Sequence, residues 1–263
     1  DYHFPSLKYM PSTFKSPQQM TGSIAKTYYA KKMGIDPKDL VVVSVMPCIA
    51  KKYEANLPYQ KTYGKKDVDY SITTRELAKM LKEGSVDLKF MPEEDFDDPL
   101  GESTGAGVIF GATGGVLEAA LRTVYEKYTG KTLEDVNFMA VRGTQGIREA
   151  TVQINGRSIR VAALSGLGNA RKILEKIVKG EEHYDIIEIM ACPGGCVNGG
   201  GQPYSHDRDE VVEQRIRGLY QIDRNLPIRK SHENPSIQKL YQEYLGEAGS
   251  HLAHELLHVH GRD

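Results

Sequence analysis

Segments with helical spacing of apolar residues alternate with short apolar runs along this chain, and this alternation predicts an α/β fold. The expected helices lie at residues 16–33, 75–84, 115–128, 168–179, 208–221, 235–245 and 250–258. The expected strands lie at residues 41–46, 68–74, 136–142 and 184–190, with a hairpin over 150–163 that turns at Asn155-Gly156. We therefore expect mixed, mainly parallel β-sheet flanked by helices.

Local signals support the expected boundaries of the first helix and the first strand. Ser16 and Pro17 place a capping residue and a first-turn proline at the start of the first helix, and Gly34 follows its end. The run at 41–46 has the composition of a buried strand. Such a strand would deliver Cys48 into a loop at its C-terminal end, where open α/β sheets bind ligands.

Length and charge indicate an ordinary globular chain. Its 263 residues, 40% of them hydrophobic, can bury a core as one large domain or as two lobes. A formal net charge of -1 gives no electrostatic case for binding nucleic acid or an anionic membrane. No apolar run approaches the roughly 20 residues that span a bilayer, and no signal peptide is visible. The chain starts at Asp1 rather than Met, which suggests a truncated, processed or partial sequence.

Three cysteines carry the strongest chemical signal. Cys192 and Cys196 are separated by Pro-Gly-Gly within the loop at 190–203, and three more glycines follow at 199–201. Glycines let backbone N–H groups approach a ligand, and beside thiolates such donors suit an iron–sulfur cluster. With Cys48 the chain holds three cysteines, so it cannot complete a four-cysteine cluster. An odd, sparse set favours a reducing, cytoplasmic compartment; the alternative is that all three are small core residues.

Three weaker motifs allow other interpretations. His254 and His258 form a His-Glu-Leu-Leu-His pattern typical of zinc proteases, although His260 is not a convincing third ligand. The acidic segment at 93–98 lacks the alternation of a calcium loop and is better interpreted as a solvated surface loop. The glycine-rich segment at 101–115 opens a helix and is a weak candidate for a phosphate site, because no Gly-Lys-Ser/Thr ending follows.

The cysteine loops resemble those of a known family. Residues 46–54, Met-Pro-Cys-Ile-Ala-Lys-Lys-Tyr-Glu, resemble the second active-site signature of the [FeFe]-hydrogenases, and the loop at 190–203 resembles the third. Similar matches lie at residues 13–19, 73–77, 101–115, 141–143 and 229–234, so the resemblance covers essentially the whole chain. The family's first signature, which carries a fourth cluster cysteine and a proton-shuttling cysteine, has no match here.

The resemblance implies a two-lobed catalytic domain with its active site in a cleft. It implies a large-subunit portion over residues 1–222 and a helical, small-subunit-like tail over 223–263. The implied cofactor is the H-cluster, a [4Fe–4S] cluster joined to a di-iron subcluster with CO, cyanide and dithiolate ligands. The implied roles are metal ligation by Cys48, Cys192 and Cys196, with Cys196 as the bridge, pocket lining by Pro17, Gln18, Met46, Phe110 and Met190, cyanide binding by Lys51 beside Glu54, and proton transfer by Ser12.

The implied activity is the reversible oxidation of H2 to protons and electrons. The expected partners are an N-terminal segment or subunit with the fourth cysteine and accessory iron–sulfur clusters, a ferredoxin-like electron carrier and maturation proteins. We expect the chain to be inactive without that segment. A hydrogen sensor and a eukaryotic iron–sulfur assembly factor are the alternatives; the Ser-His-Glu-Asn tail at 231–234 and the glycine block around Phe110 favour the enzyme.

Overall fold

The computed structural model describes residues 2–259, and the chain divides into two compact units. Within the described range, unit 1 comprises residues 2–10, 103–199 and 204–234, and unit 2 comprises residues 11–102, 200–203 and 235–259. Helices and β-sheets occur in both units, so the predicted α/β class is confirmed. No helix among the described residues combines the length and apolar character needed to cross a membrane.

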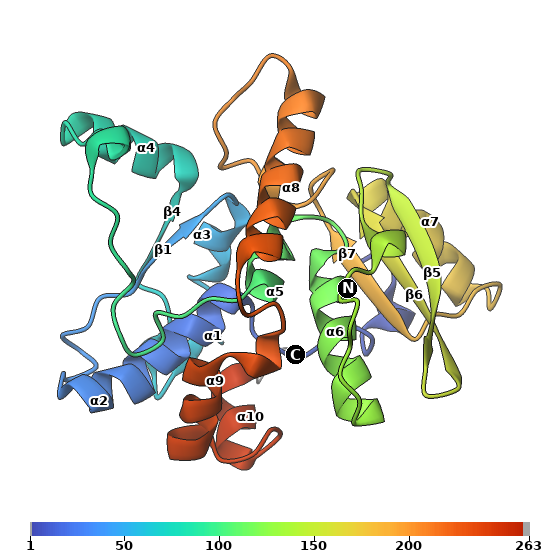
Figure 1. Ribbon diagram of the computed structural model, residues 1–263, viewed down its shortest axis with the longest axis horizontal. Coiled ribbons are helices and arrows are strands. Elements are labelled where there is room, and N and C mark those ends of the chain that lie inside the picture. The colour runs from blue at the N-terminus through green and yellow to red at the C-terminus, as the bar shows by residue number, and fades with distance from the viewer. Residues whose placement is uncertain (1, 260–263) are drawn as a thin grey trace. The chain divides into compact units, whose positions relative to one another are not determined.

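Unit 1 is organised around a three-stranded sheet. The strands β5 (Ile147–Ile154), β6 (Arg157–Ser165) and β7 (Ile186–Met190) lie in that order, with β5 antiparallel and β7 parallel to β6. The predicted hairpin turn is confirmed, because Asn155 and Gly156 have φ angles of 49° and 77°. Helices α6 (Gly115–Thr129) and α7 (Leu167–Val178) cover opposite faces of this sheet (Figure 1).

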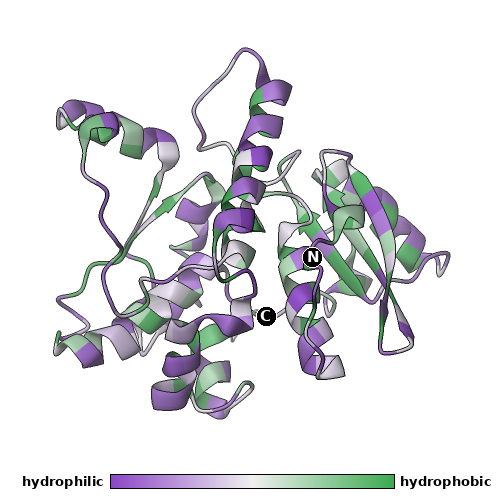
Figure 2. Ribbon diagram, viewed as in Figure 1, coloured by the Kyte–Doolittle hydropathy of each residue, from purple (hydrophilic) through white to green (hydrophobic). Residues whose placement is uncertain are grey.

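The alternation of side chains along β6 creates the two cores of this sheet. Val161 and Ala163 face the cluster that contains Leu117 and Leu121 of α6, whereas Ala162 and Leu164, which alternate with them, face the cluster of α7. All these β6 positions are apolar, as expected for a central strand covered on both faces. Figure 2 shows hydrophobic residues gathered on the strands of the sheet.

Two further helices complete unit 1. They are α5 (Gly105–Val108) and α8 (Arg208–Asn225), whose Tyr220 packs with Ile109 and Ala112. Buried charges also join α8 to α6: Arg122 donates hydrogen bonds of 2.8 Å to Asp223 and 2.7 Å to Glu118. Removing one partner from such a buried cluster would leave an uncompensated charge, so the cluster fixes α6 against α8.

Unit 2 combines helices with two small two-stranded sheets. Strand β1 (Val43–Met46) pairs in parallel with β4 (Tyr70–Thr73), and β2 (Lys61–Thr62) pairs antiparallel with β3 (Lys65–Lys66). Its helices are α1 (Pro17–Ile24), α2 (Ala30–Met33), α3 (Ala50–Glu54), α4 (Thr74–Glu83), α9 (Pro235–Leu240) and α10 (His251–Leu257). A π-type turn joins α1 to α2, so the predicted helix at 16–33 is confirmed as one interrupted element. Ile24 and Tyr28 from this element share a core with Leu240 and Leu256.

Residues 136–142 do not form the expected strand. Val136 and Val141 are buried individually, and Met139–Val141 forms a 3-10 turn. The carbonyl oxygen of Val136 accepts a 2.9 Å hydrogen bond from Arg122 Nε. The N–H groups of Val141 and Arg142 bond locally to the carbonyls of Phe138 and Met139, so they do not enter a strand ladder.

Strand β1 is less buried than expected. Val43 and Val45, two residues apart and therefore on one face, are 52% and 42% exposed. Among the described strands, β1 pairs with β4 alone. The expectation of a buried strand before Cys48 is therefore wrong for this structure, in which the side chains on one face of β1 stay exposed.

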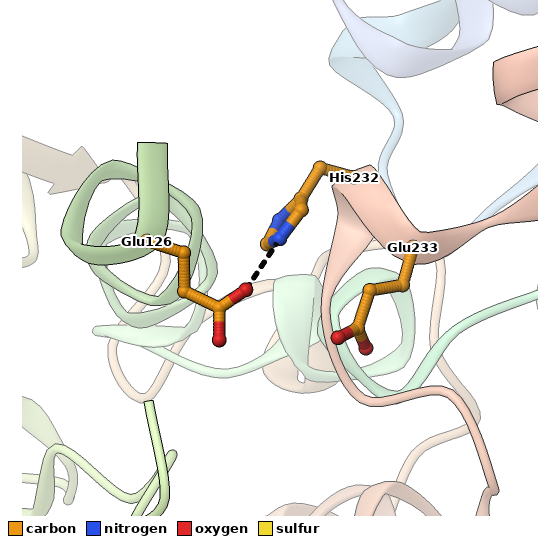
Figure 3. Close-up of side chains that lie close together, drawn as sticks. All are labelled: Glu126, His232 and Glu233. Atoms are coloured by element: carbon orange, nitrogen blue, oxygen red, sulfur yellow. Dashed lines mark hydrogen bonds and ion pairs between the residues drawn. The ribbon is translucent and has the colours of Figure 1, made fainter. Parts of the chain in front are cut away.

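A second charged cluster lies near the C-terminal end of α6 (Figure 3). The Glu126 carboxylate accepts hydrogen bonds of 2.6 Å from Lys230 Nζ, 2.7 Å from His232 Nε2 and 2.7 Å from the Leu133 N–H. Lys230 also bonds Glu233 at 3.0 Å. Burial alone would raise the pKa of Glu126, but these hydrogen bonds outweigh burial and lower the pKa to about 2.

We predict that this cluster makes the free energy of unfolding depend on pH below about pH 5. Because the pKa of Glu126 is lowered on folding, its stabilisation is complete above its ordinary value of 4.5 and is lost as the pH falls toward about 2. After discounting for solvent screening, we expect Glu126→Gln to lower the free energy of unfolding by about 1–2 kcal/mol at pH 7. Urea denaturation of both proteins should show this difference shrinking between pH 5 and about pH 2.

The exposed Glu134 provides the matched control. Glu134→Gln should change the free energy of unfolding by less than about 0.5 kcal/mol at either pH. A Glu126→Gln difference that stays constant down to the lowest pH would contradict the proposed linkage.

Candidate functional site

The Cys192–Cys196 loop leaves the end of β7 and is held by β6. Met190, the last residue of β7, accepts a 2.8 Å hydrogen bond at its carbonyl oxygen from the Gly166 N–H. The hydroxyl of Ser165, at the end of β6, accepts a 2.7 Å hydrogen bond from the Gly194 N–H. A 3.0 Å bond from the Gly195 N–H to the Cys192 carbonyl closes the turn. The predicted delivery of Cys192 by a strand is thus confirmed.

Gly195 provides the closest packing in this loop. Its φ angle is 104°, and a Cβ placed on it would lie 2.6 Å from the Thr113 nitrogen and 2.7 Å from the Gly111 carbonyl oxygen. A side chain is therefore excluded on two grounds, conformation and space. The Thr113 N–H in turn donates a 3.2 Å bond to the Gly194 carbonyl. In unit 1 this glycine thus allows contact between two backbone segments, the cysteine loop and the residues just before α6.

The second cysteine begins a short 3-10 turn, Cys196–Asn198. Arg215 of α8 donates a 2.9 Å hydrogen bond to the Val197 carbonyl, and the Asn198 side chain donates one of 2.8 Å to the Pro193 carbonyl. Both cysteines of the loop are half-buried. The polypeptide therefore holds Cys192 and Cys196 in a loop with several fixed backbone contacts.

Glu188 fixes the other side of this arrangement. It lies on β7, and its carboxylate accepts hydrogen bonds of 2.6 Å from the Gly114 N–H and 2.8 Å from the Leu117 N–H at the start of α6. Burial raises the pKa of Glu188, and the hydrogen bonds from Leu117 and Gly114 oppose that rise. The role of Glu188 was not expected from the sequence, although a carboxylate between isoleucines inside a predicted strand is a detectable signal.

Cys48 lies in unit 2, one residue after Pro47, and is half-buried. The Gly201 N–H donates a 3.0 Å hydrogen bond to the Pro47 carbonyl, and the Gly201 carbonyl accepts one of 3.1 Å from the Arg75 N–H. A Cβ on Gly201 would lie 3.0 Å from the Cys48 nitrogen. Gly201 therefore packs against the backbone of the Cys48 turn within unit 2.

Gln18 connects the elements around the Cys48 turn. Its side-chain nitrogen donates hydrogen bonds of 3.2 Å to the Lys51 carbonyl and 3.1 Å to Glu54, and its oxygen accepts one of 2.7 Å from the Ser44 hydroxyl. Because Gln18 is on α1, Ser44 on β1 and the other two on α3, this one amide ties three elements together. The sequence had not indicated a role for Ser44.

Glu54 collects a second set of contacts. Its carboxylate pairs with the Lys51 ammonium, as expected, and accepts a hydrogen bond from the Ser16 hydroxyl. Ser16 has the extended backbone of a helix N-cap, yet its side chain makes no capping hydrogen bond to α1. The expected capping by Ser16 is therefore wrong, because its hydroxyl is used by Glu54.

The remaining predicted residues lie at the following places. In unit 2, Ser12 and Pro17 are exposed, and Met46 is half-buried at the end of β1. In unit 1, Phe110 and Met190 are half-buried. The Ser12 Oγ accepts a 3.2 Å hydrogen bond from the Phe14 N–H. In unit 2 the structure thus brings Gln18 and Lys51 together on Glu54. In unit 1 the turn that contains Phe110, Ile109–Gly111, leads into the backbone packed on Gly195.

Two other groups of side chains carry potential metal ligands. The rings of His254 and His258 stack with centroids 4.1 Å apart, and His258 Nδ1 lies 2.8 Å from the Thr13 hydroxyl. Stacked rings do not converge on a common ion, and His260 lies outside the described residues. The second group is Glu126, His232 and Glu233, in which one ligand atom from each residue lies within 4.8 Å of the others (Figure 3). The Lys230 ammonium already bridges the carboxylates of Glu126 and Glu233.

The residues of unit 1 fit an iron–sulfur cluster. Cys192 and Cys196 are not in a disulfide, and thiolates are the ligands that such clusters require. The hydroxyl of the adjacent Thr113, a residue that is 1% exposed, has no hydrogen-bond partner within the described chain. An unpaired buried hydroxyl costs about 1–3 kcal/mol, so this site favours an additional acceptor next to the loop.

Comparisons with known proteins agree with this arrangement. A family model described as iron only hydrogenase large subunit, C-terminal domain, matches residues 1–200, and one described as iron hydrogenase small subunit matches residues 209–263. The NADP-reducing hydrogenase subunit HndD of Solidesulfovibrio fructosivorans is 53% identical over 260 residues, which are 99% of this chain and 44% of that protein. The chain therefore spans less than half the length of this relative.

Solved structures and a more distant relative extend the comparison. A structure of the [FeFe]-hydrogenase HydA1 from Chlamydomonas reinhardtii is similar with a TM-score of 0.83 and 43% identity, covering 98% of this chain and 71% of that one. The cytosolic Fe-S cluster assembly factor narfl of Danio rerio is 30% identical over 257 residues, which are 94% of this chain and 61% of that protein. The family model over residues 1–200, the similar solved structure and the cysteine loops agree: this chain belongs to the [FeFe]-hydrogenase family and represents a C-terminal part of its H-cluster domain.

Proposed function

We propose that this chain is the C-terminal part of the catalytic portion of an [FeFe]-hydrogenase that catalyses the reversible oxidation of H2 to protons and electrons. In this proposal Cys48, Cys192 and Cys196 are three ligands of one [4Fe–4S] cluster. A fourth cysteine comes from an N-terminal segment or subunit, and Cys196 bridges to the di-iron subcluster. The assignment of a small-subunit-like tail to residues 223–263 is part of the same proposal.

The observation that carries the proposal is the way the backbone holds each cysteine loop. In unit 1, Gly195 packs against Thr113 with no room for a Cβ, and in unit 2 the Cys48 turn is bonded to Gly201. Such fixed loops suit a ligand that needs thiolates at defined positions. Membership of the hydrogenase family supports iron and sulfur as that ligand.

When bound, the H-cluster supplies an open iron site for hydrogen chemistry and a store for one electron. We assign to Lys51 a charge-assisted hydrogen bond to an anionic cyanide ligand. An ammonium has three donors, so its pairing with Glu54 leaves others for this role. Gln18 and Glu54 then act as positioning residues that orient Lys51 and the Cys48 turn. Pro17, Met46, Phe110 and Met190 are proposed to line the di-iron pocket, and Ser12 to serve as one step of the proton path.

We also propose the partners that the chemistry requires. Electrons must reach the cluster from a carrier, for which we propose a ferredoxin-like protein in the cytoplasm; the name of the relative from Solidesulfovibrio fructosivorans adds an NADP-linked subunit as a second candidate. Maturation proteins would insert the di-iron subcluster. Reduction assays with ferredoxin and with NADP would distinguish the two carriers.

A second candidate function is iron–sulfur cluster assembly without hydrogen turnover. It is favoured by the 30% identity to the assembly factor of Danio rerio. The two functions differ in the cofactor, because only the hydrogenase requires the diatomic ligands of the di-iron subcluster. Infrared bands of CO and cyanide in the matured protein would support the enzyme, and a protein that binds [4Fe–4S] but never acquires these bands would support the assembly role.

We predict that hydrogen evolution requires the missing segment. The chain should be co-expressed with maturation proteins, once alone and once with the N-terminal segment that supplies the fourth cysteine. Activity with a chemical reductant should appear in the second preparation only, because three protein thiolates leave the cluster one ligand short. Hydrogen evolution by the chain alone would contradict this requirement.

We predict that each cysteine is needed for the cluster. Cys48→Ser, Cys192→Ser and Cys196→Ser, each made in the chain joined to that segment, should bind far less iron and lose the electron paramagnetic resonance (EPR) signal of a reduced [4Fe–4S] cluster. Circular dichroism should show that helix content is kept. Ser158→Ala, at an exposed position of β6, is the matched control and should bind iron as the wild type does. Full iron binding by any of the three cysteine variants would remove that residue from the ligand set.

We predict a more selective effect for Lys51. Lys51→Met should lower the rate of hydrogen evolution by about 10–100-fold, the usual cost of losing a hydrogen bond to a metal ligand, and should shift a cyanide band in the infrared spectrum. The neighbouring Lys52, which pairs with Glu76 at 2.6 Å on the surface, is the control. Lys52→Met should keep both the rate and the spectrum. An unshifted cyanide band in a fully loaded Lys51→Met protein would argue against the assigned role.

A further inference from the structure

Thr113 carries a buried hydroxyl that the described protein does not satisfy. The residue is 1% exposed, and its Oγ1 makes no hydrogen bond to any described group. Hydroxyl groups in protein interiors nearly always have a partner, because transferring them from water without one is costly. The partner of Thr113 is therefore expected to be something other than the surrounding polypeptide.

The backbone places Thr113 directly against the cysteine loop of unit 1. Its N–H donates a 3.2 Å hydrogen bond to the Gly194 carbonyl, and its nitrogen lies 2.6 Å from the position that a Cβ on Gly195 would take. Gly194 and Gly195 immediately precede Cys196 in the sequence. A ligand held by the sulfur atoms of this loop would thus lie close to Thr113.

The carboxylate of Glu188, which binds the N–H of the next residue, does not serve as the acceptor. Glu188 uses its two oxygens for the N–H groups of Gly114 and Leu117, at 2.6 Å and 2.8 Å. These bonds fix the residue that follows Thr113, so Glu188 positions the hydroxyl without binding it. The acceptors that a cluster would bring to this loop are thiolate and sulfide sulfur atoms.

We propose that the Thr113 hydroxyl donates a hydrogen bond to a sulfur atom of the cluster bound at the Cys192–Cys196 loop and thereby raises the reduction potential of that cluster. The inference rests on the proposed function, since it requires a cluster at this loop. Reduction adds negative charge that is spread over the sulfur atoms, and a donor aimed at one of them stabilises the reduced form more than the oxidised form.

The test uses the chain joined to the segment with the fourth cysteine, loaded with the [4Fe–4S] cluster but not with the di-iron subcluster. Thr113→Val keeps the branched shape and removes the hydroxyl, whereas Thr113→Ser keeps the hydroxyl and removes the methyl group. A redox titration followed by EPR gives the potential of each. For Thr113→Val we expect the ratio of reduced to oxidised cluster at a fixed potential to fall about tenfold, a shift of about 59 mV to more negative values for one electron. Thr113→Ser should stay close to the wild type.

A comparison of the wild type with Thr113→Ala keeps the inference testable if Thr113→Val does not fold. After exchange into D2O, hyperfine spectroscopy of the reduced cluster should detect an exchangeable deuteron that is absent from Thr113→Ala, which adds no bulk. An unchanged potential in a fully loaded Thr113→Val protein, or equal shifts in the Val and Ser variants, would overturn the inference and indicate water or packing instead. A wild-type protein that assembles no [4Fe–4S] cluster would instead overturn the proposed function.

Discussion

Contact between backbone segments, made possible by glycine, is the constraint on which the cysteine loops depend. Gly195 lies so close to Gly111 and Thr113 that a Cβ would overlap both. The same loop is bonded to the ends of β6 and β7 through Ser165 and Met190. A thiolate pair that must bind metal benefits from such support, because the loop does not have to be ordered when the ligand arrives.

Buried charged side chains also restrain the position of α6 in unit 1. The carboxylate of Glu188 binds two N–H groups at the start of α6, and Arg122 in the middle of that helix binds Glu118 and Asp223. These ions are expensive to bury singly but are paired or hydrogen-bonded here, so they act as geometric restraints more than as a source of stability. Helix α6 is thus fixed at the end that adjoins the cysteine loop and along its length. In unit 2 the neutral amide of Gln18 performs the same task around Cys48.

Much of the fold could be predicted because its signals are local. The Asn155-Gly156 turn, the helix over 115–128 and the strand before Cys192 follow from turn chemistry and apolar spacing alone. The segment at 136–142 was misassigned because its apolar composition does not reveal that Met139–Val141 turns and bonds locally, which removes N–H groups that a strand would have paired. The burial of the strand at 41–46 was overestimated because apolar composition does not reveal whether another element covers a given face of a strand.

The candidate site, too, could be predicted only in part from the sequence. Cysteine spacing and glycine content identified the loops, whereas their supports come from residues whose roles depend on tertiary contacts, such as Ser44, Thr113 and Ser165. The central claim is that three cysteines hold one cluster, and a crystal structure of the anaerobically loaded protein, phased on the anomalous scattering of iron, tests it most directly. The expected result is one iron–sulfur cluster bonded to the Sγ atoms of Cys48, Cys192 and Cys196. Iron bonded to the Cys192–Cys196 loop while Cys48 lies away from it would show that the three cysteines do not share a cluster.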